Sequence, residues 1–345
     1  MDYYEVCDEP DEPKKKKTYK PNTAMSEDEF RRKFSTEAKA RAYYEKRRWG
    51  SKPKCPYCGS IQIGIWKGGG MRKGWYKCHG CNKAFTVRVG TIMERSHIPL
   101  RKWLLAEYYI VTVRKGISGL ELSKKLGVTQ KNIWFLHQRI RHALGAENYD
   151  YMLGGLGKIV DGDETYVCGR NKNRHSNKKI IGSGPVGKGI VLGMVERGGR
   201  KKAIVVSDTE RETIRREINK HIRKNTLLST DEGRHYIGIQ KDGYKHRTCN
   251  HSAKAWVNGK ASTNGVESMW ALLKRGFYGI YHKFSMKHLP KYLAESVFRL
   301  NEGQCKYLTM DRIDALAGYC WDKRLTWEDC VGEWQDREPQ MYEMR

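Results

Sequence analysis

Apolar residues change their spacing along this chain, and the change separates helical from strand-forming segments. From residue 98 to 144, apolar positions recur every three or four residues, which predicts helices. Three apolar runs with glycine-bearing turns follow and predict consecutive strands: KIVDGDETYVCG, GIVLGMVERGG and KKAIVVSDT. ERETIRREINKHI then predicts an amphipathic helix, and TLLSTDEG a short buried strand. The order β-β-β-α-β, with further helices after it, predicts an α/β domain with a mixed sheet.

The helical region contains a candidate DNA-reading motif. LRKWLLAEYYIVTVRKG predicts one apolar helix that ends at Gly116. In ISGLELSKKLGVTQKNIWFLHQRIRHAL, Gly127 marks a turn between two helices and Thr129 caps the second, which predicts a helix-turn-helix. The second helix of such a motif places its first residues against base edges. Those residues are Gln130, Lys131 and Asn132, and Arg139 adds positive charge further along. A small helical hairpin of any other kind has the same pattern and stays open.

The charge balance favours a polyanionic partner. The 345 residues carry a formal net charge of +27, from 66 Lys and Arg against 39 Asp and Glu, and nucleic acid is the commonest polyanion. A basic solubilising surface is the alternative. No apolar stretch approaches the ~18 residues that span a bilayer, and the first residues lack the apolar core of a secretory signal. We therefore expect an intracellular protein with no membrane partner, whose ten cysteines are reduced.

Four of the cysteines are spaced as metal ligands. Cys55 and Cys58 form one CxxC pair, and Cys78 and Cys81 form another further along the chain. Four thiolates at this spacing predict a zinc ribbon that holds a structural Zn²⁺ in a tetrahedron. Two unrelated redox pairs are the alternative, which the surrounding Pro, Gly and aromatic residues disfavour. His79, between the second pair, is expected to be a bystander.

Acidic residues occur at the ends of predicted strands, although the chain is strongly basic. A period of two places Asp161 and Asp163 on one face of their strand and Glu164 on the other. Asp231 ends a hydrophobic strand, where α/β sheets build sites. Glu267 opens the helix predicted in STNGVESMWALLKRGFYGIYHK. Carboxylates on two strands and a helix can converge, although each of them alone is also compatible with an ordinary solvated acid.

Convergent carboxylates suit phosphodiester chemistry that uses two Mg²⁺ ions. One ion activates the attacking oxygen and the other stabilises the leaving oxygen. Hard cations take oxygen ligands, so Asp and Glu are the expected residue types. Lys274 and Arg275, further along the helix that Glu267 opens, are predicted to contact DNA phosphate.

Several segments together resemble DDE transposases of bacterial insertion sequences. The group is the ISXO2-like one, which has an N-terminal zinc ribbon and is related to eukaryotic Merlin elements. The segments are CPYCGS, YKCHGCNKAFTVRVGTIMERSHIPLRKW, KGISGLELSKKLGVT, DGDETYVCGR, STDEG and TNGVESMWALLKRGFYGIYHKFSMKHLPKYLAESVFRLN. The resemblance implies a ribonuclease H-like domain that cuts element ends and joins their 3′-OH groups to target DNA. It implies Asp163, Asp231 and Glu267 as the catalytic trio, the same trio that spacing and chemistry indicate.

Three further residues are accessory candidates by this resemblance. The position of Asp161 is often Glu in such enzymes, and the retained carboxylate predicts little effect. The segment before Asn264 often carries a His and here reads KAST, which offers no such residue. His251, in CNHSAKAW, resembles a family His ahead of the final acid and would assist near the scissile phosphate. An ordinary hydrogen-bonded His is the alternative for His251.

The predicted chain has six parts. They are a disordered basic arm (1–25), a helical segment (26–50), the zinc ribbon (51–96), the helix-turn-helix domain (97–146), the ribonuclease H-like catalytic domain (155–302) and a helical tail (303–345). The predicted activity is that of a Mg²⁺-dependent transposase, with Mn²⁺ as a substitute, acting on terminal inverted repeats and target DNA. Because two ends are cut in concert, a homodimer or higher oligomer is expected.

Two other function classes stay open at this point. One is a DNA-binding regulator descended from a transposase, and the other is a metal-dependent nuclease that cuts without joining. The host decides the compartment: the cytoplasm at the nucleoid in a bacterium, or the nucleus in a eukaryote.

Overall fold

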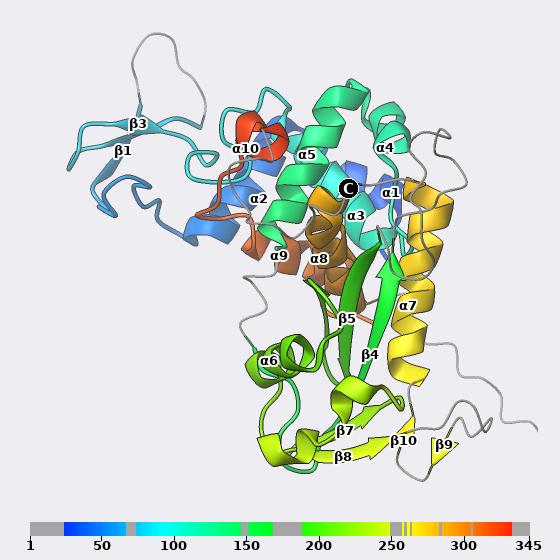
Figure 1. The fold of residues 1–345 in the computed structure, drawn as a ribbon. Helices are drawn as coiled ribbons and strands as arrows, with labels where there is room; N and C mark the ends of the chain where they lie inside the picture. The colour runs from blue at the N-terminus through cyan, green and yellow to red at the C-terminus, as the bar shows by residue number, and fades with distance from the viewer. Residues whose placement is uncertain are drawn as a thin grey trace, which may run out of the picture.

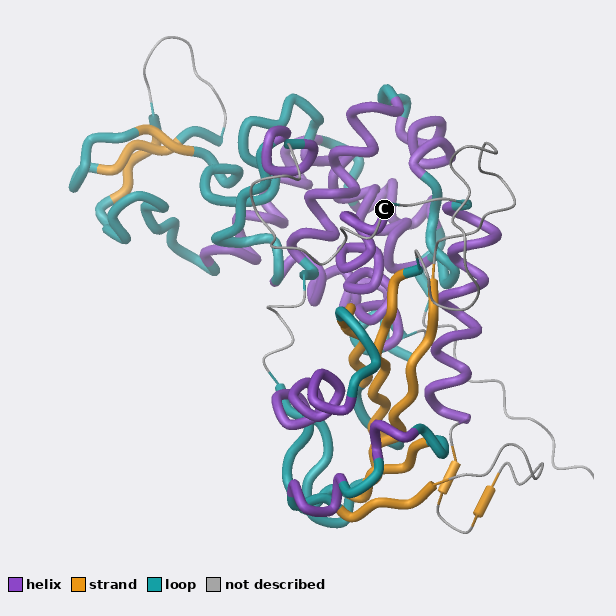
Figure 2. The backbone as a smooth tube through the Cα atoms, viewed as in Figure 1, coloured by secondary structure: helices purple, strands orange, loops and turns teal. Residues whose placement is uncertain are grey.

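The computed structural model describes residues 24–66, 74–145, 151–167, 188–248, 257–258, 261–262, 264–282, 285–304 and 306–332. His251 and nearly all of the predicted basic arm lie outside these residues. The described chain forms a body of helices, a central sheet with helices on both faces, and a small β element that projects from the helical body (Figure 1). Figure 2 shows this small sheet well apart from the central one.

The central sheet has five strands in the order β6-β5-β4-β7-β8. The strands are β4 (Ile159–Val167), β5 (Gly189–Glu196), β6 (Lys201–Val206), β7 (Leu227–Thr230) and β8 (Lys245–Thr248). The first three pair antiparallel, whereas β7 pairs parallel to β4 and β8 parallel to β7. With α6 (Arg211–His221) between β6 and β7, the predicted order β-β-β-α-β and the mixed sheet are confirmed.

Helices cover both faces of the central strands, and successive strand residues point to opposite faces. The covering helices are α6, already given, with α7 (Asn264–Gly276) and α8 (Leu289–Leu300). Val191 and Val195 of β5 belong to the core formed with α7 and α8. Leu192 and Met194 belong to the core formed with α6. Figure 1 shows α7 running beside β4, with α6 on the other side of the sheet.

Several short elements complete the structure. They are the strands β1 (Ile63–Ile65), β2 (Tyr76–Cys78), β3 (Ala84–Phe85), β9 (Val257–Asn258) and β10 (Ala261–Ser262), and the turns η4 (Arg234–Tyr236), η5 (Ile239–Asp242), η6 (Phe277–Tyr281) and η7 (Met286–His288). The first three strands form a small antiparallel sheet of their own, and β9 pairs with β10.

The remaining helices form a second core, which the C-terminal segment completes. They are α1 (Glu27–Lys33), α2 (Glu37–Trp49), α3 (Leu100–Thr112), α4 (Gly119–Leu126), α5 (Gln130–Ala143), α9 (Thr309–Gly318) and α10 (Trp327–Val331). Ser26 starts α1 in a reciprocal capping box with Glu29, in agreement with its predicted helix start. Ile313 of α9 and Cys320 just after it are buried in the same core as Trp103 of α3.

The C-terminal helices α9 and α10 lie in the predicted helical tail, and α9 packs against the N-terminal helices. The Arg312 guanidinium donates to the Val111 carbonyl at 3.0 Å, and the Tyr43 hydroxyl donates to Asp314 at 2.6 Å. These contacts join α9 to α2 and α3, far away in the sequence. The pattern of residues within a short helix shows which face is apolar, but not which distant element will cover that face.

A buried ion group joins the helical body to the domain of the central sheet. Glu295 of α8, 1% exposed, accepts a hydrogen bond from Arg141 Nε of α5 at 2.5 Å. Its other oxygen accepts from the Tyr281 hydroxyl at 3.0 Å and from Arg299. Burial disfavours the carboxylate, but the Arg141 and Arg299 guanidiniums outweigh burial and lower the pKa of Glu295 well below its usual range.

Glu295→Gln should lower the free energy of unfolding by about 3–5 kcal/mol, because it leaves two buried guanidiniums without a carboxylate. The matched control is Glu27→Gln, which breaks an exposed pair with Arg31 at 2.8 Å. That control should cost less than ~1 kcal/mol. Denaturant unfolding followed by circular dichroism measures both changes. Similar losses in the two variants would contradict a special role for the buried group.

The folding stability of the protein should depend on pH because of Glu107 in α3. This residue is fully buried, and its Oε1 accepts from the Tyr44 hydroxyl at 2.8 Å, while Oε2 has no hydrogen-bond partner among the described residues. Burial raises the pKa of Glu107 to about 8. A folded-state pKa above the unfolded value gives stability that is present at low pH and is lost as the pH rises through about 8.

Glu107→Gln should therefore match the wild type in acid and exceed its stability above about pH 8. The expected gain is on the order of a few kcal/mol, since a tenfold change in an ionisation equilibrium corresponds to about 1.4 kcal/mol. Thermal melts of both proteins between mildly acidic and alkaline pH measure this difference. A gap that stays constant across the pH range would show that the carboxyl does not titrate as stated.

Candidate active site and zinc centre

Asp163 lies in the middle of β4, and Asp231 directly follows β7, the strand that pairs in parallel with β4. β4 and β7 pair in parallel from Ile159 opposite Leu227 to Asp161 opposite Ser229, and Asp163 and Asp231 each follow the last of these pairs by two residues. Asp231 directly follows the last residue of β7, where the sequence predicted it. Burial, followed by the negative charges of Glu164 and Asp231, raises the pKa of Asp163 to about 6. The two carboxylates are thus close enough to repel each other.

An indole from α7 holds Asp163 in place. Trp270 Nε1 donates to Asp163 Oδ2 at 2.9 Å. Gly193 of β5, the register partner of Asp163, makes room for this contact, because a Cβ there would lie 2.4 Å from Trp270 Cζ2. Glu267 is exposed and precedes Trp270 by three residues, so it lies about one helical turn from the indole. Glu267 is therefore a near neighbour, on the surface of α7, of the residue that contacts Asp163.

The three acids do not form one tight cluster of ligand atoms. In the part of the chain that the structure describes, the cysteine group below is the one set of three or more His, Cys, Asp or Glu ligands within 4.8 Å of one another. A pair of divalent ions about 3.5–4 Å apart spreads its ligands over a larger space. Three carboxylates from three elements fit hard cations by their chemistry. Asp163, Asp231 and Glu267 are therefore a suitable donor set for such a pair.

Glu164 points to the other face of β4, as the strand period predicted. Its Oε2 lies 3.0 Å from His235 Nε2, and its Oε1 accepts from the Tyr236 hydroxyl. Burial alone would lower the pKa of His235, but Glu164, Asp231 and Asp163 raise it above its usual value. Neither His235 nor Tyr236 was singled out from the sequence. Their one sequence signal is their place in DEGRHY, directly after Asp231.

The accessory candidates have different surroundings. Asp161 is 1% exposed and accepts from Arg197 Nε at 2.9 Å, so its charge is already paired. Gly265 of α7 packs against it, because a Cβ at 265 would lie 2.8 Å from Asp161 Oδ2. Asp161 thus positions α7 on the sheet and is not open to a cation. Asn264 begins α7, and the structure describes no more of it than this backbone position. His251 lies outside the described residues.

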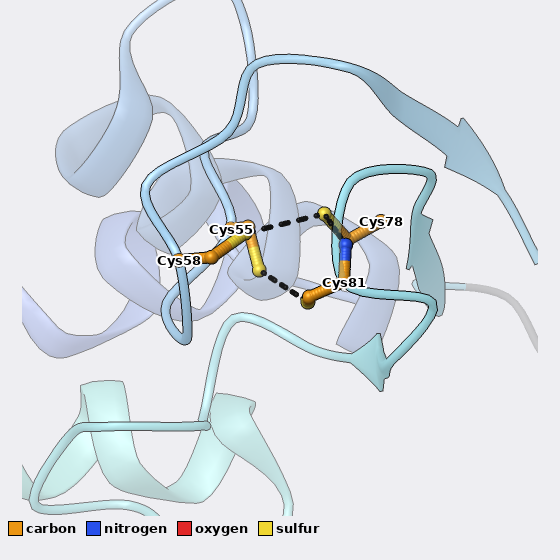
Figure 3. A group of neighbouring side chains, drawn as sticks. All are labelled: Cys55, Cys58, Cys78 and Cys81. Atoms are coloured by element: carbon orange, nitrogen blue, oxygen red, sulfur yellow. Dashed lines mark hydrogen bonds between the residues drawn. The ribbon is translucent and has the colours of Figure 1, made fainter.

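The four predicted zinc ligands converge, as Figure 3 shows for the two facing pairs. Cys55 Sγ lies 3.6 Å from Cys81 Sγ, and Cys58 Sγ lies 3.6 Å from Cys78 Sγ. When four sulfurs surround a Zn²⁺ as a tetrahedron with Zn–S distances of about 2.3 Å, the distances between sulfurs are close to the 3.6 Å found here. The backbone N–H of Cys81 donates to Cys78 Sγ at 3.5 Å and lowers the pKa of that thiol to about 6. The group therefore fits a tetrahedral Zn²⁺.

Two helices with a tight turn occur where the sequence predicted them. α4 ends at Gly127, whose φ of 56° is left-handed, and Thr129 occupies the position before α5 without a side-chain cap. The first residues of α5, Gln130, Lys131 and Asn132, are exposed. From Leu136 onward the helix is almost entirely buried. Only its N-terminal tip is thus open to a large partner.

Arg139 does not share the exposed tip. It is 8% exposed, its guanidinium donates to the Glu94 carbonyl at 3.0 Å, and it lies 4.3 Å from the Phe135 ring centroid. We therefore do not retain it as a DNA-contact candidate. Other helices of the body cover this part of α5, and α10 adds Trp327, whose ring lies 5.7 Å from that of Trp134. Lys274 is half-buried and Arg275 exposed on α7, which leaves both open to solvent.

Two family models match separate parts of the chain. Residues 152–301 match the ISXO2-like transposase domain, and residues 35–84 match the transposase zinc-ribbon domain. The chain carries an ISXO2-like transposase domain. The domain ends with α8 and contains β4, β7 and α7, the three elements of the acidic site. The zinc-ribbon match includes α2 as well as the four cysteines, which supports a structural Zn²⁺ in this part of the chain.

Similar proteins come from mobile elements. A protein of Halobacterium salinarum described as an uncharacterized protein in transposable element ISH50 is 26% identical over 259 residues, 70% of this chain and 83% of that protein. A Mos1 transposase paired-end complex with left transposon end aligns at 10% identity and a TM-score of 0.20, over 59% of this chain and 79% of that chain. The Mos1 strand transfer complex aligns at 10% identity and 0.20, over 62% and 78%. Such TM-scores support no inference about this protein.

No helix among the described residues is both long and apolar enough to cross a bilayer.

Cys78→Ser should remove most of the zinc from the purified protein, because one of four ligands is lost and the metal and the ribbon fold are coupled. Elemental analysis of zinc per chain measures this. Cys330→Ser is the matched control, since Cys330 is a buried thiol of α10 outside the cysteine group. The control should keep its zinc. Equal zinc content in Cys78→Ser and wild type would exclude the proposed centre.

Proposed function

We propose that this chain is a DNA transposase that hydrolyses the ends of a mobile element and joins the freed 3′-OH groups to target DNA. One observation carries the proposal. Asp163 of β4 and Asp231 after β7 each lie two residues beyond the last paired residues of these parallel strands, and Trp270, whose indole donates to Asp163, follows Glu267 by three residues on α7. This arrangement occurs inside the domain that matches the ISXO2-like transposase family.

We assign the domain a ribonuclease H-like fold. Numbered within the domain, its strands lie in the order 3-2-1-4-5, with the first three antiparallel and the last two added in parallel. The acids stand on the first strand and directly after the fourth, which are neighbours in the middle of the sheet. A mixed sheet of this order with helices on both faces supports the assignment.

Two Mg²⁺ ions, which Mn²⁺ can replace, would activate the attacking oxygen and stabilise the leaving oxygen when bound. Asp163, Asp231 and Glu267 are the residues that would hold them. The Trp270 N–H fixes the orientation of one Asp163 oxygen and leaves the other oxygen for this task. Burial, followed by the negative charges of Glu164 and Asp231, raises the pKa of Asp163, and a cation there would offset the repulsion. Water attacks first and the released 3′-OH attacks second, so no protein group forms a covalent intermediate.

The DNA partners are the terminal inverted repeats and the target. Gln130, Lys131 and Asn132 at the exposed tip of α5, together with the zinc ribbon, are assigned to end binding. Lys274 and Arg275 of α7 are assigned to backbone phosphate near the acids. Because two ends must be joined in concert, the active form is a homodimer or a higher oligomer. In a bacterium this complex works at the nucleoid, and in a eukaryote in the nucleus.

A regulator descended from a transposase would need the DNA-binding parts but not the acids. The placement of Asp163 and Asp231 by two parallel strands, and the room that Gly193 leaves for Trp270, are features that DNA binding alone does not need. They favour the enzyme. A nuclease that cuts without joining would use the same acids, so only the reaction products separate it from a transposase.

Glu267→Gln should abolish joining of a pre-cleaved, labelled element end to plasmid DNA in Mg²⁺, with end binding unchanged. The variant keeps the size of the side chain and removes the charge that would hold a cation. Glu212→Gln is the matched control, because it removes an exposed carboxylate from the first turn of α6, and it should keep full activity. A gel assay detects joined and cleaved products separately.

The pattern of products decides between the classes. Joining by wild type that is lost in Glu267→Gln supports strand transfer at this site. End binding by wild type with neither cleavage nor joining would favour the regulator. Cleavage without joining would identify the nuclease.

A further inference from the structure

A cavity of about 330 Å³ lies between the helical body and the transposase domain, on a different face of α7 from Glu267. Ser268 and Leu272 line it, whereas Glu267 and Lys274 project from another face of the helix. Its other walls come from the end of α3, the start of β6 and the C-terminal half of α8. This cavity is separate from the acidic site and has no role in the chemistry described above.

The wall of the cavity is positively charged. Five cationic side chains line it, and no Asp or Glu does: Arg114, Lys115, Lys201, Arg299 and Lys306. Among the described residues, Lys201 and Lys306 make no ion pair with a carboxylate, and the pKa of Lys201 is lowered by burial and by the charge of Lys306. Like charges placed together without a counter-ion favour an anion between them.

A second observation points the same way. Arg299 is buried, with 8% of its side chain exposed, and shares the Glu295 carboxylate with Arg141. Two guanidiniums against one carboxylate leave one positive charge in excess, and His137 beside them is neutral because burial lowers its pKa to about 3. A buried charge without a full counter-charge is costly. An anion in the cavity would supply the missing negative charge from the Arg299 side.

The cavity suits a phosphate that carries an organic part. Its volume lies within the range of small-molecule sites, which is larger than a single inorganic ion requires. Leu272, Leu273 and Leu300 give it an apolar floor that a sugar can cover. Arg114, Lys115 and Lys306 are exposed, so positive charge extends from the cavity to the surface. A strand that continues past the cavity would meet these cations with its neighbouring phosphates.

We infer that this cavity holds a backbone phosphate of a DNA strand, at a place behind α7 that is distinct from the metal-ion site. The inference builds on the proposed function in taking DNA as the partner. A strand anchored there lies against the helix that carries Glu267, and it lies against α3 and α8 at the junction of the two bodies. DNA bound at this position therefore contacts both bodies at once.

The test compares the salt dependence of DNA binding in the full-length protein. Fluorescence anisotropy with a labelled duplex of arbitrary sequence is measured over a range of salt for wild type and for Lys201→Ala/Lys306→Ala. Losing two phosphate contacts should reduce the slope of log K against log salt by about 2 and weaken binding at low salt about tenfold or more. Lys201→Arg/Lys306→Arg, which keeps both charges, should restore the slope. Thermal melts confirm that each variant is folded.

The matched control is Lys33→Ala/Lys220→Ala, which removes two exposed lysines of α1 and α6, away from the cavity. The slope of log K against log salt for this control should change by less than half as much as the slope for Lys201→Ala/Lys306→Ala. Equal changes in the two double variants would overturn the inference, because the cavity lysines would then act only through net charge. No change in either variant would also overturn it, because the cavity lysines would then make no contact with DNA phosphate.

A further experiment distinguishes a DNA phosphate from a free phosphate compound as the ligand of the cavity. Inorganic pyrophosphate is titrated into each protein and followed by thermal shift. If it stabilises wild type but not the cavity variant, while DNA affinity is the same in both, the ligand is a free phosphate compound and the DNA assignment is wrong. The joining assay is run in parallel, so loss of the transposase proposal and loss of this inference give different results. Joining can fail while cavity-dependent DNA binding persists, and the reverse can occur.

Discussion

The placement of the two bodies depends on one buried carboxylate. Glu295 of α8 accepts from Arg141 of α5, from Arg299 one turn along its own helix, and from Tyr281 after α7. A charge buried in this way is stable only while its partners stay in position, because the low dielectric of the interior strengthens both the attraction and the cost of a missing partner. The helical body and the transposase domain therefore meet at a site with strict geometry. The same group leaves an excess positive charge beside the cavity behind α7, so one interaction shapes both the joint and the surface next to it.

The acidic site depends on the packing of uncharged residues as much as on charge. Asp163 lies near Asp231 because β4 and β7 pair in parallel up to Asp161 and Ser229, two residues before each of the acids. Its orientation depends on Trp270, which crosses β5 at Gly193, where any larger residue would collide with the indole. Asp161 and Arg197 form an ion pair below this point, against Gly265 of α7. A raised pKa at Asp163 is the consequence of collecting acids on a buried strand, and such strain is typical of sites that are built for a ligand and not for stability.

Packing of α5 limits how DNA can be read by the helical body. The apolar spacing of α4 and α5, with the left-handed Gly127 between them, follows from the sequence. What the spacing did not show is that α5 is covered on almost every side beyond its first turn, by the body, by α8 and by α10. Arg139 was expected to add positive charge for DNA, yet it is buried, as is Arg141, and both side chains donate hydrogen bonds within the protein. The helices after residue 303 explain the difference, since they complete the core around α2, α3 and α5 from far along the chain.

The sequence alone determined the local features. Cysteine spacing, strand period and helix capping depend on residues a few positions apart, so the ribbon ligands, the order of elements and the opposite faces of Asp163 and Glu164 were all visible in it. The convergence of Asp163, Asp231 and Glu267 could be proposed from strand ends and family resemblance, but their relation to Trp270 and Gly193 could not. Those contacts, the pairing of Asp161 with Arg197, and the burial of Arg139, Arg141 and Glu295 depend on which distant elements pack together. Only the tertiary structure decides this packing, because burial and charge pairing depend on neighbours in space. The sequence does not show whether a cationic side chain contacts water, a carboxylate or DNA.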